Sequence, residues 1–181
     1  MRPLALLLCC LAASAAPAEP EGYRFAVATI DALELVERSE EDYGRNSYPP
    51  AADAAANATL EKAAAGLRPF QKSARPKVAA AARASVDLLE GVVRLRRPLE
   101  KEASGGKTSE ELWAAFPKTV AAATSGMLGS KGRYDFTAEQ RRALSARLEE
   151  LKGRRKGGKA QGAAARLEAF LNDKRIKGSD E

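Results

Sequence analysis

Histidine is absent from this chain of 181 residues, and its two cysteines, Cys9 and Cys10, lie in an apolar stretch near the start. The rest of the chain therefore cannot use a Cys or His nucleophile, a Ser-His-Asp triad, His or Cys zinc ligands, protein-ligated haem, an iron–sulfur cluster or a disulfide. Aromatic residues make up only 6% of the chain, too few to line a glycosidase cleft. We expect a binding protein that is not an enzyme and has no cofactor or metal site.

Residues 1–18 have the form of a secretory signal peptide. Arg2 supplies the positive charge, residues 4–11 are apolar, and mostly small residues follow up to Ala18. Cleavage after Ala15 and cleavage after Ala18 both satisfy the small-x-small pattern, so the sequence leaves the site open. A lipid anchor on Cys9 is disfavoured, because Leu8 stands where a small residue is expected. No later stretch is long enough to span a bilayer. We expect a periplasmic or secreted protein.

Alanine dominates the remainder of the chain. After residue 18 there are 32 Ala against 29 Leu, Ile, Val and Phe together. Ala has the highest helix propensity, but it buries little apolar area. We find no alternating strand pattern of useful length. The composition therefore predicts an all-α fold, a slim Ala-rich bundle of four to six helices with a thin core and no sheet.

Turn residues and capping signals divide the chain into helices. We predict helices over 24–43 and 51–65, then one that follows Pro76. Two capping boxes, Thr108 with Glu111 and Thr137 with Gln140, begin the next two. The glycines expected to end the fourth helix are Gly126, Gly129 and Gly132. Residues 19–152 would form the bundle, residues 153–162 a basic Gly-rich linker, and residues 163–181 a short helix and a polar tail.

The clearest apolar periodicity follows Pro76. Its members recur in alternating steps of three and four, as in a heptad seam. They are Val78, Ala81, Ser85, Leu88, Val92, Leu95 and Leu99. Such a seam serves either as the core stripe of a bundle or as a surface for self-association, for example in a homodimer. Trp113 lies beside the stripe of the next helix and is a candidate exposed anchor.

Charge is distributed unevenly. Residues 19–60 hold nine acidic and three basic side chains, whereas residues 131–181 hold eight acidic and fourteen basic ones. If the acidic first helix packs against a basic one, part of this asymmetry is neutralised internally. The densest basic run comprises Lys152, Arg154, Arg155, Lys156 and Lys159. It is a candidate site for an anionic protein, lipid or polymer, with a solvated linker as the alternative. Nucleic acid is not expected, because no aromatic residue interleaves the run.

An acidic cluster lies on one face of the first predicted helix. Glu34, Glu37 and Glu41 are spaced by three and four residues, so they could hold a hard cation or act as paired catalytic carboxylates. Glu34 and Glu41 also stand four residues before Arg38 and Arg45, the favourable order for helix ion pairs. We favour a solvated, ion-paired face.

Three short motifs match known patterns without their context. Gly106-Lys107-Thr108 lacks the preceding strand and the first glycine of a phosphate-binding loop. Ser104 and Lys107 have the S-x-x-K spacing of serine enzymes that act on peptidoglycan, but no Lys-Thr-Gly accompanies them. The sequon at Asn57 falls on a predicted helix, an unfavourable place for glycosylation.

The stretch Phe136-Thr137-Ala138-Glu139-Gln140-Arg141 resembles the L-T-x-x-Q motif of small periplasmic stress proteins of the Spy and CpxP kind. The resemblance implies a helical, basic protein that binds unfolded or envelope proteins as a dimer. It covers five residues and carries over no functional residue.

Together these features favour an exported, non-enzymatic helical protein of the cell envelope. We expect it to hold acidic or partly unfolded partner proteins through a basic helical surface, aided by exposed apolar side chains. The alternative is a structural or self-associating envelope module that uses the seam from Val78 to Leu99. A hydrolase using carboxylates or a Ser/Lys pair is a third, less favoured class.

Overall fold

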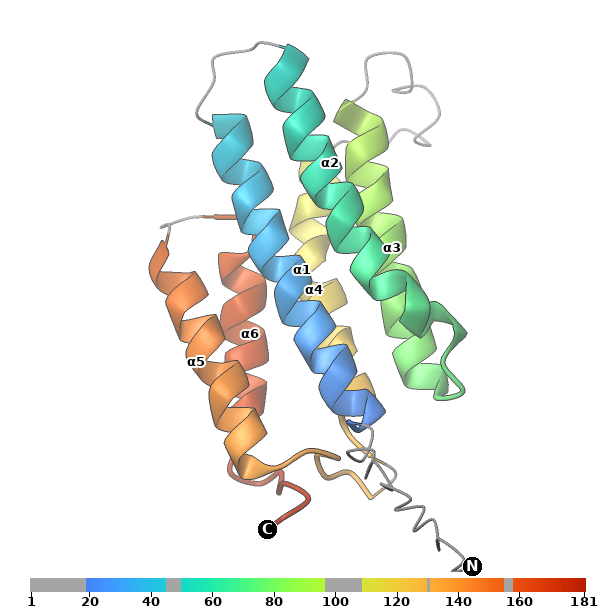
Figure 1. Ribbon diagram of the computed structural model, residues 1–181, viewed down its shortest axis with the longest axis vertical. Helices are drawn as coiled ribbons and strands as arrows, with labels where there is room; N and C mark the ends of the chain where they lie inside the picture. Colours follow the sequence, from blue (N-terminus) through green and yellow to red (C-terminus); the bar gives the residue numbers. More distant parts are fainter. Residues whose placement is uncertain (1–18, 45–49, 97–108, 130, 155–157) are drawn as a thin grey trace, which may run out of the picture.

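The computed structural model describes residues 19–44, 50–96, 109–129, 131–154 and 158–181. Within these ranges the chain forms six α-helices and no sheet, which confirms the all-α prediction (Figure 1). The helices are α1 (Glu21–Gly44), α2 (Pro50–Leu67), α3 (Pro76–Arg96), α4 (Ser109–Met127), α5 (Ala138–Arg154) and α6 (Gln161–Leu171), and a 3-10 turn, η1 (Arg68–Lys72), follows α2. The predicted signal peptide with Cys9, the predicted cap at Thr108 and the motifs at 104–107 lie outside the described residues.

The first four helices form an up-and-down bundle. α2 packs against α1 and α3, and α4 packs against α3 and α1. α5 and α6 form a hairpin that packs against α1 and α4 (Figure 1). Consecutive helices run in opposite directions, so every second connection lies at the same end. The connections α2–α3 and α4–α5 and the tail after α6 share one end with the start of the described chain, at the bottom of Figure 1.

The core runs through all six helices. The apolar stripe of α5, which recurs at steps of three and four, is buried and consists of Leu144, Leu148 and Leu151. Burial of such a side chain stabilises the fold by about 1.5–3 kcal/mol. The Ala-rich α2 buries Leu60 and Leu67 together with small side chains that let it lie close to α1. The interpretation of Trp113 as an exposed anchor is wrong, because only 6% of it is accessible.

Glycine also allows close contact between helices near the end of α4. The helix ends at Met127, between Gly126 and Gly129, as the series of glycines predicts. A Cβ atom at Gly126 would lie 3.2 Å from the Cα of Val78 and 3.0 Å from Cε1 of Phe25. The missing side chain therefore lets α4 approach α3 and α1. Gly132, in the turn before α5, has a φ of 69°, a conformation that favours glycine.

The capping box at the start of α5 is confirmed. The Thr137 backbone N–H donates to Gln140 Oε1 at 2.9 Å, and the Gln140 N–H donates to Thr137 Oγ1 at 3.1 Å. The Ala138 N–H, another backbone donor at the start of α5, donates to Asp180 Oδ1 at 2.8 Å. The polar tail is thus hydrogen-bonded to the start of α5.

Candidate functional site

The acidic face of α1 packs against bases from other helices. Arg147 of α5 donates to Asp31 at 2.6 Å and to Glu34 at 2.9 Å, and Arg96 of α3 donates to Glu40 at 2.5 Å. These pairs neutralise part of the charge asymmetry inside the molecule. Glu34 therefore does not pair with Arg38, because α5 supplies a closer partner. Arg45 lies outside the described residues.

The structure places part of the basic run in ion pairs within the hairpin. Lys152 binds Glu149 at 2.8 Å and also Glu168 of α6, and these hydrogen bonds raise its pKa. Arg154 binds Glu150 at 2.7 Å. Lys159 is exposed, with no ion pair among the described residues. Arg155 and Lys156 lie outside the described residues. Intramolecular carboxylates therefore already compensate two of the five candidate charges.

A cleft of about 650 Å³ lies between α1, α2 and the end of α5. It brings the acidic cluster and one residue of the basic run together, since Glu34, Glu37, Glu41 and Arg154 all line it. Glu37 is 2% exposed, and its carboxylate lies against Gly158 before α6. Among the described residues, no group of His, Cys, Asp or Glu is arranged to hold a metal ion. Charges of both signs face this cleft, so it offers no strong preference for an anion or a cation.

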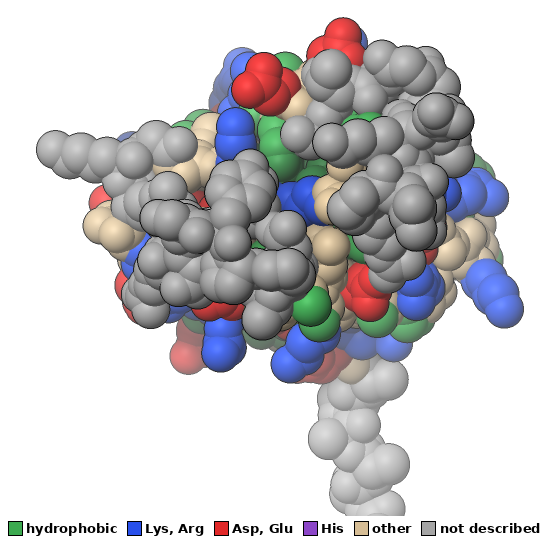
Figure 2. Space-filling model, turned by 90° about the horizontal axis from the view of Figure 1, so that it is seen from above, with side chains coloured by type: hydrophobic (Ala, Val, Ile, Leu, Met, Phe, Trp, Pro, Cys, Tyr) green, Lys and Arg blue, Asp and Glu red, His purple; other side chains and the backbone are tan. Residues whose placement is uncertain are grey.

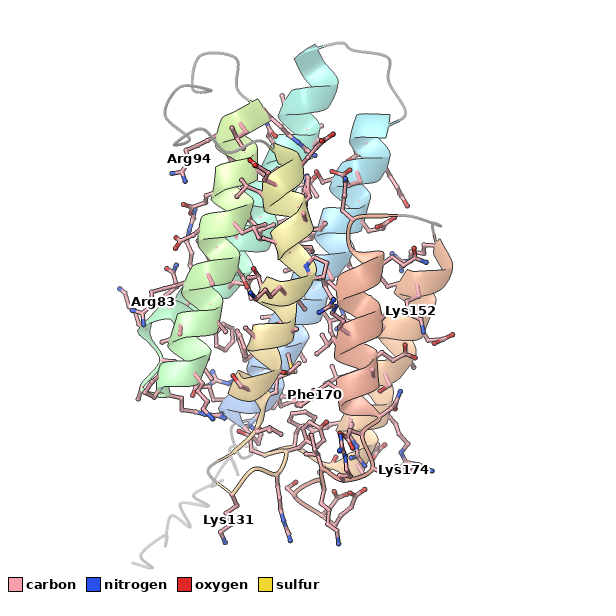
Figure 3. All side chains as sticks on the ribbon, turned by 180° about the vertical axis from the view of Figure 1, so that it is seen from behind. Arg83, Arg94, Lys131, Lys152, Phe170 and Lys174 are labelled. Carbon is pink, nitrogen blue, oxygen red and sulfur yellow. The ribbon has the colours of Figure 1, made fainter. Side chains whose placement is uncertain are left out.

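A second set of bases gathers at the end of the bundle that holds the α2–α3 and α4–α5 connections and the tail. Six exposed Lys and Arg side chains from these segments have no ion pair among the described residues. We call them the basic end, and they are Lys72, Lys77, Lys131, Arg133, Lys174 and Lys177. Lys131 and Lys174 extend outward at this end in Figure 3. Two exposed carboxylates without a partner among the described residues, Glu19 and Glu139, belong to the same end of the molecule.

Most of the net charge of the chain is concentrated in this region. The segments 19–24, 68–77, 128–142 and 172–181 carry twelve Lys and Arg against seven Asp and Glu, and the net charge of the whole chain is +6. Five of the seven carboxylates are held by Arg75, Arg141, Arg175 or a backbone N–H. At the opposite end, Figure 2 shows basic and acidic side chains interspersed around the rim. The described surface is therefore most positive at the basic end.

Arg75 and Asp135 connect the segments that form the basic end. Arg75 Nη1 donates to Asp135 Oδ2 at 2.9 Å, and its Nη2 donates to the carbonyl of Leu128. The same Oδ2 accepts the Gly22 N–H at 3.1 Å, which caps the start of α1. A shallow cleft of about 800 Å³ adjoins this connection, lined among others by Arg75, Lys77 and Asp135. One ion pair thereby fixes the starts of α1 and α3 against the turn after α4.

The tail is held in place by backbone and side-chain contacts. The Tyr134 N–H donates to the carbonyl of Lys177 at 3.0 Å, and Arg141 donates to the carbonyl of Ile176 at 2.9 Å and to Glu181 at 2.7 Å. The Tyr134 hydroxyl is buried, which raises its pKa, and it donates to the carbonyl of Phe170 at 2.6 Å. These contacts fix Lys174 and Lys177 beside the turn that carries Lys131.

The heptad seam lies within the core of the single chain. Val78, Leu88 and Val92 are at most 6% exposed, Leu95 is half-buried, and Leu99 lies outside the described residues. The described part of the seam is therefore covered by the chain's own helices. More generally, no described Leu, Ile, Val, Met or aromatic side chain with an assigned exposure is fully exposed.

The basic end is not evident from the sequence, because its members come from segments far apart in the chain. Each segment carries only two of them and by itself has the character of an ordinary polar turn. One signal was available: in an up-and-down bundle, alternate connections meet at one end. The turns at 68–77 and 128–137 and the tail at 172–181 are such alternate connections.

Comparison of the chain with models of protein families, with curated proteins and with solved structures gives no match. No helix in the described part of the chain is both long and apolar enough to cross a bilayer.

Proposed function

We propose that the chain is an exported, non-enzymatic binding protein of the cell envelope that holds an anionic partner, such as an acidic protein, through the basic end. The observation that supports this is the set of six exposed, unpaired bases from three distant segments. Their charges are open to solvent, whereas those of Lys152 and Arg154 are partly compensated. An anionic partner would therefore be attracted most strongly to this end.

Charge is the main contribution that the described surface offers to such binding. Exposed charges attract over about 8 Å at physiological ionic strength and are screened by added salt. No described large apolar side chain with an assigned exposure is fully exposed, so these side chains add less to the interaction than the charges do. We therefore expect binding to be fast, weak to moderate, and strongly reduced at high salt. For the same reason, a partly unfolded client would be held through its acidic segments.

Light scattering tests this proposal on two aggregating clients, one acidic and one basic, at low and at high salt. The exported protein should suppress aggregation of the acidic client at low salt, and the effect should disappear at high salt. A variant with Lys131→Gln, Lys174→Gln and Lys177→Gln should lose most of the suppression.

A matched triple variant serves as the control, with Arg83→Gln, Arg94→Gln and Lys118→Gln. These three bases are also exposed and carry the same total charge, but they lie along α3 and α4. Figure 3 labels the two on α3, Arg83 and Arg94. The control variant should retain most of the suppression. Equal suppression of the acidic and basic clients, or equal loss in both variants, would contradict the proposal.

A further inference from the structure

The chemistry of the basic end favours one kind of anionic partner. Five of its six bases are lysines, whose ammonium groups are flexible point charges. Arginine, by contrast, has the fixed planar geometry that recognises a particular carboxylate or phosphate through two hydrogen bonds. The lysines come from three segments and are spread over the end of the bundle. Such an arrangement suits a partner that presents many anionic groups over an area.

Among the described residues, the basic end has no fully exposed aromatic side chain of the kind that anchors the centre of a specific protein interface. Tight protein interfaces depend on aromatic or arginine anchors that become buried in a pocket at the centre of the contact. Here the nearby aromatic rings of Tyr134 and Phe136 are at most 2% exposed and pack together in the core, 5.0 Å apart. Arg75 is already engaged by Asp135 and the carbonyl of Leu128. Phe70, Leu128 and Ile176 are half-buried at this end, so an incoming protein would find exposed lysines around partly accessible apolar side chains, none of them fully exposed.

We propose that the partner of the basic end is the anionic phospholipid surface of a membrane. This inference rests on the proposed function, because it names the partner of the same surface. The lysines lie against the head groups, and the six helices extend away from the bilayer. No part of the described chain enters the hydrocarbon layer, and attraction to the lipid phosphates supplies the binding.

Co-sedimentation with vesicles tests the proposal. The exported protein is mixed with phosphatidylglycerol/phosphatidylcholine vesicles or with phosphatidylcholine vesicles, at low and at high salt. We expect binding to the anionic vesicles alone, and release by salt. Each lysine near an anionic surface adds roughly fivefold to the partition coefficient, so the variant lacking Lys131, Lys174 and Lys177 should bind on the order of 100-fold more weakly. The variant lacking Arg83, Arg94 and Lys118 should lose much less binding, since these bases lie along α3 and α4, farther from the lipid than the three lysines.

Two further probes separate failure of this inference from failure of the proposed function. Soluble polyglutamate stands for an acidic protein segment, and glycerol phosphate stands for the free head group. Binding to polyglutamate through the three lysines without binding to anionic vesicles would overturn the membrane inference and leave the proposed function intact. Binding to neither would overturn both. An equal loss of vesicle binding in the two triple variants would also overturn the inference, because it would show that only total charge matters. Circular dichroism of both variants checks that they are folded.

Discussion

Replacement of Asp135 by alanine tests the connection that builds the basic end. The Asp135 carboxylate caps the start of α1 by accepting the Gly22 N–H, and it pairs with Arg75. Asp135→Ala removes both interactions at once. It should therefore lower the free energy of unfolding and loosen the attachment of α1 and α3 to the turn after α4.

The expected loss in the free energy of unfolding follows from the contacts of Asp135. Loss of an N-terminal cap costs about 1 kcal/mol, and loss of a negative charge at a helix start costs about 0.5 kcal/mol more. The two side chains of the ion pair are 29% and 25% exposed, so solvent screening limits its contribution to about 0.5 kcal/mol. The other oxygen, Oδ1, is buried without a hydrogen-bond partner among the described residues. Its burial costs free energy, so removing it offsets part of the destabilisation. We expect a net loss of about 1.5 kcal/mol, or a fall in Tm of about 3–6 °C.

Urea and thermal unfolding followed by circular dichroism measure this loss. Asp87→Ala is the matched control, because Asp87 is an exposed carboxylate on α3 with no partner among the described residues. It should change stability by less than about 0.5 kcal/mol. A double-mutant cycle with Arg75→Ala should give a coupling energy of about 0.5 kcal/mol. The reasoning is refuted if Asp135→Ala is as stable as the Asp87→Ala control.

Three other results are expected from the structure. Gly126→Ala should destabilise the protein by about 1 kcal/mol, because the added methyl group meets the Val78 backbone. Gly66→Ala, with open space around the Cβ position, should stabilise it by a few tenths of a kcal/mol. If both substitutions changed the free energy of unfolding in the same direction, the close contact at Gly126 would be contradicted. Trp113 should fluoresce at shorter wavelength in the folded than in the unfolded protein and resist collisional quenching; ready quenching would show that it is exposed. Hydrogen bonds from Arg175 lower the pKa of Asp173 from 3.8 to about 2. The stabilisation from this pair is therefore complete above the ordinary pKa of Asp and is lost as the pH falls through about 2. An NMR titration should show this midpoint, and Arg175→Ala should restore the ordinary value; an unchanged midpoint in the variant would refute the cause.

Local signals in the sequence were sufficient for the helices. The capping box at Thr137 and the Leu144 to Leu151 stripe act through residues three or four positions apart, so the chain carries that information within each helix. The glycines from Gly126 onward mark the end of α4, but no local signal shows that Gly126 also permits close packing against Val78 and Phe25. Trp113 was misplaced for a similar reason, since a residue at the edge of a stripe is buried only if a neighbouring helix reaches it.

The candidate site, more than the helices, depends on contacts between residues that are far apart in the sequence. The sequence by itself determined the charge excess, the lack of Cys and His after residue 10, and the alternation of helices with polar turns. Tertiary structure decided which charges are compensated. It placed Glu168 on Lys152 and Arg147 on Glu34, and it brought Lys72, Lys131 and Lys174 to one end. Coulombic interactions depend on distance in space, and only the antiparallel packing of the helices sets those distances for residues far apart in the chain.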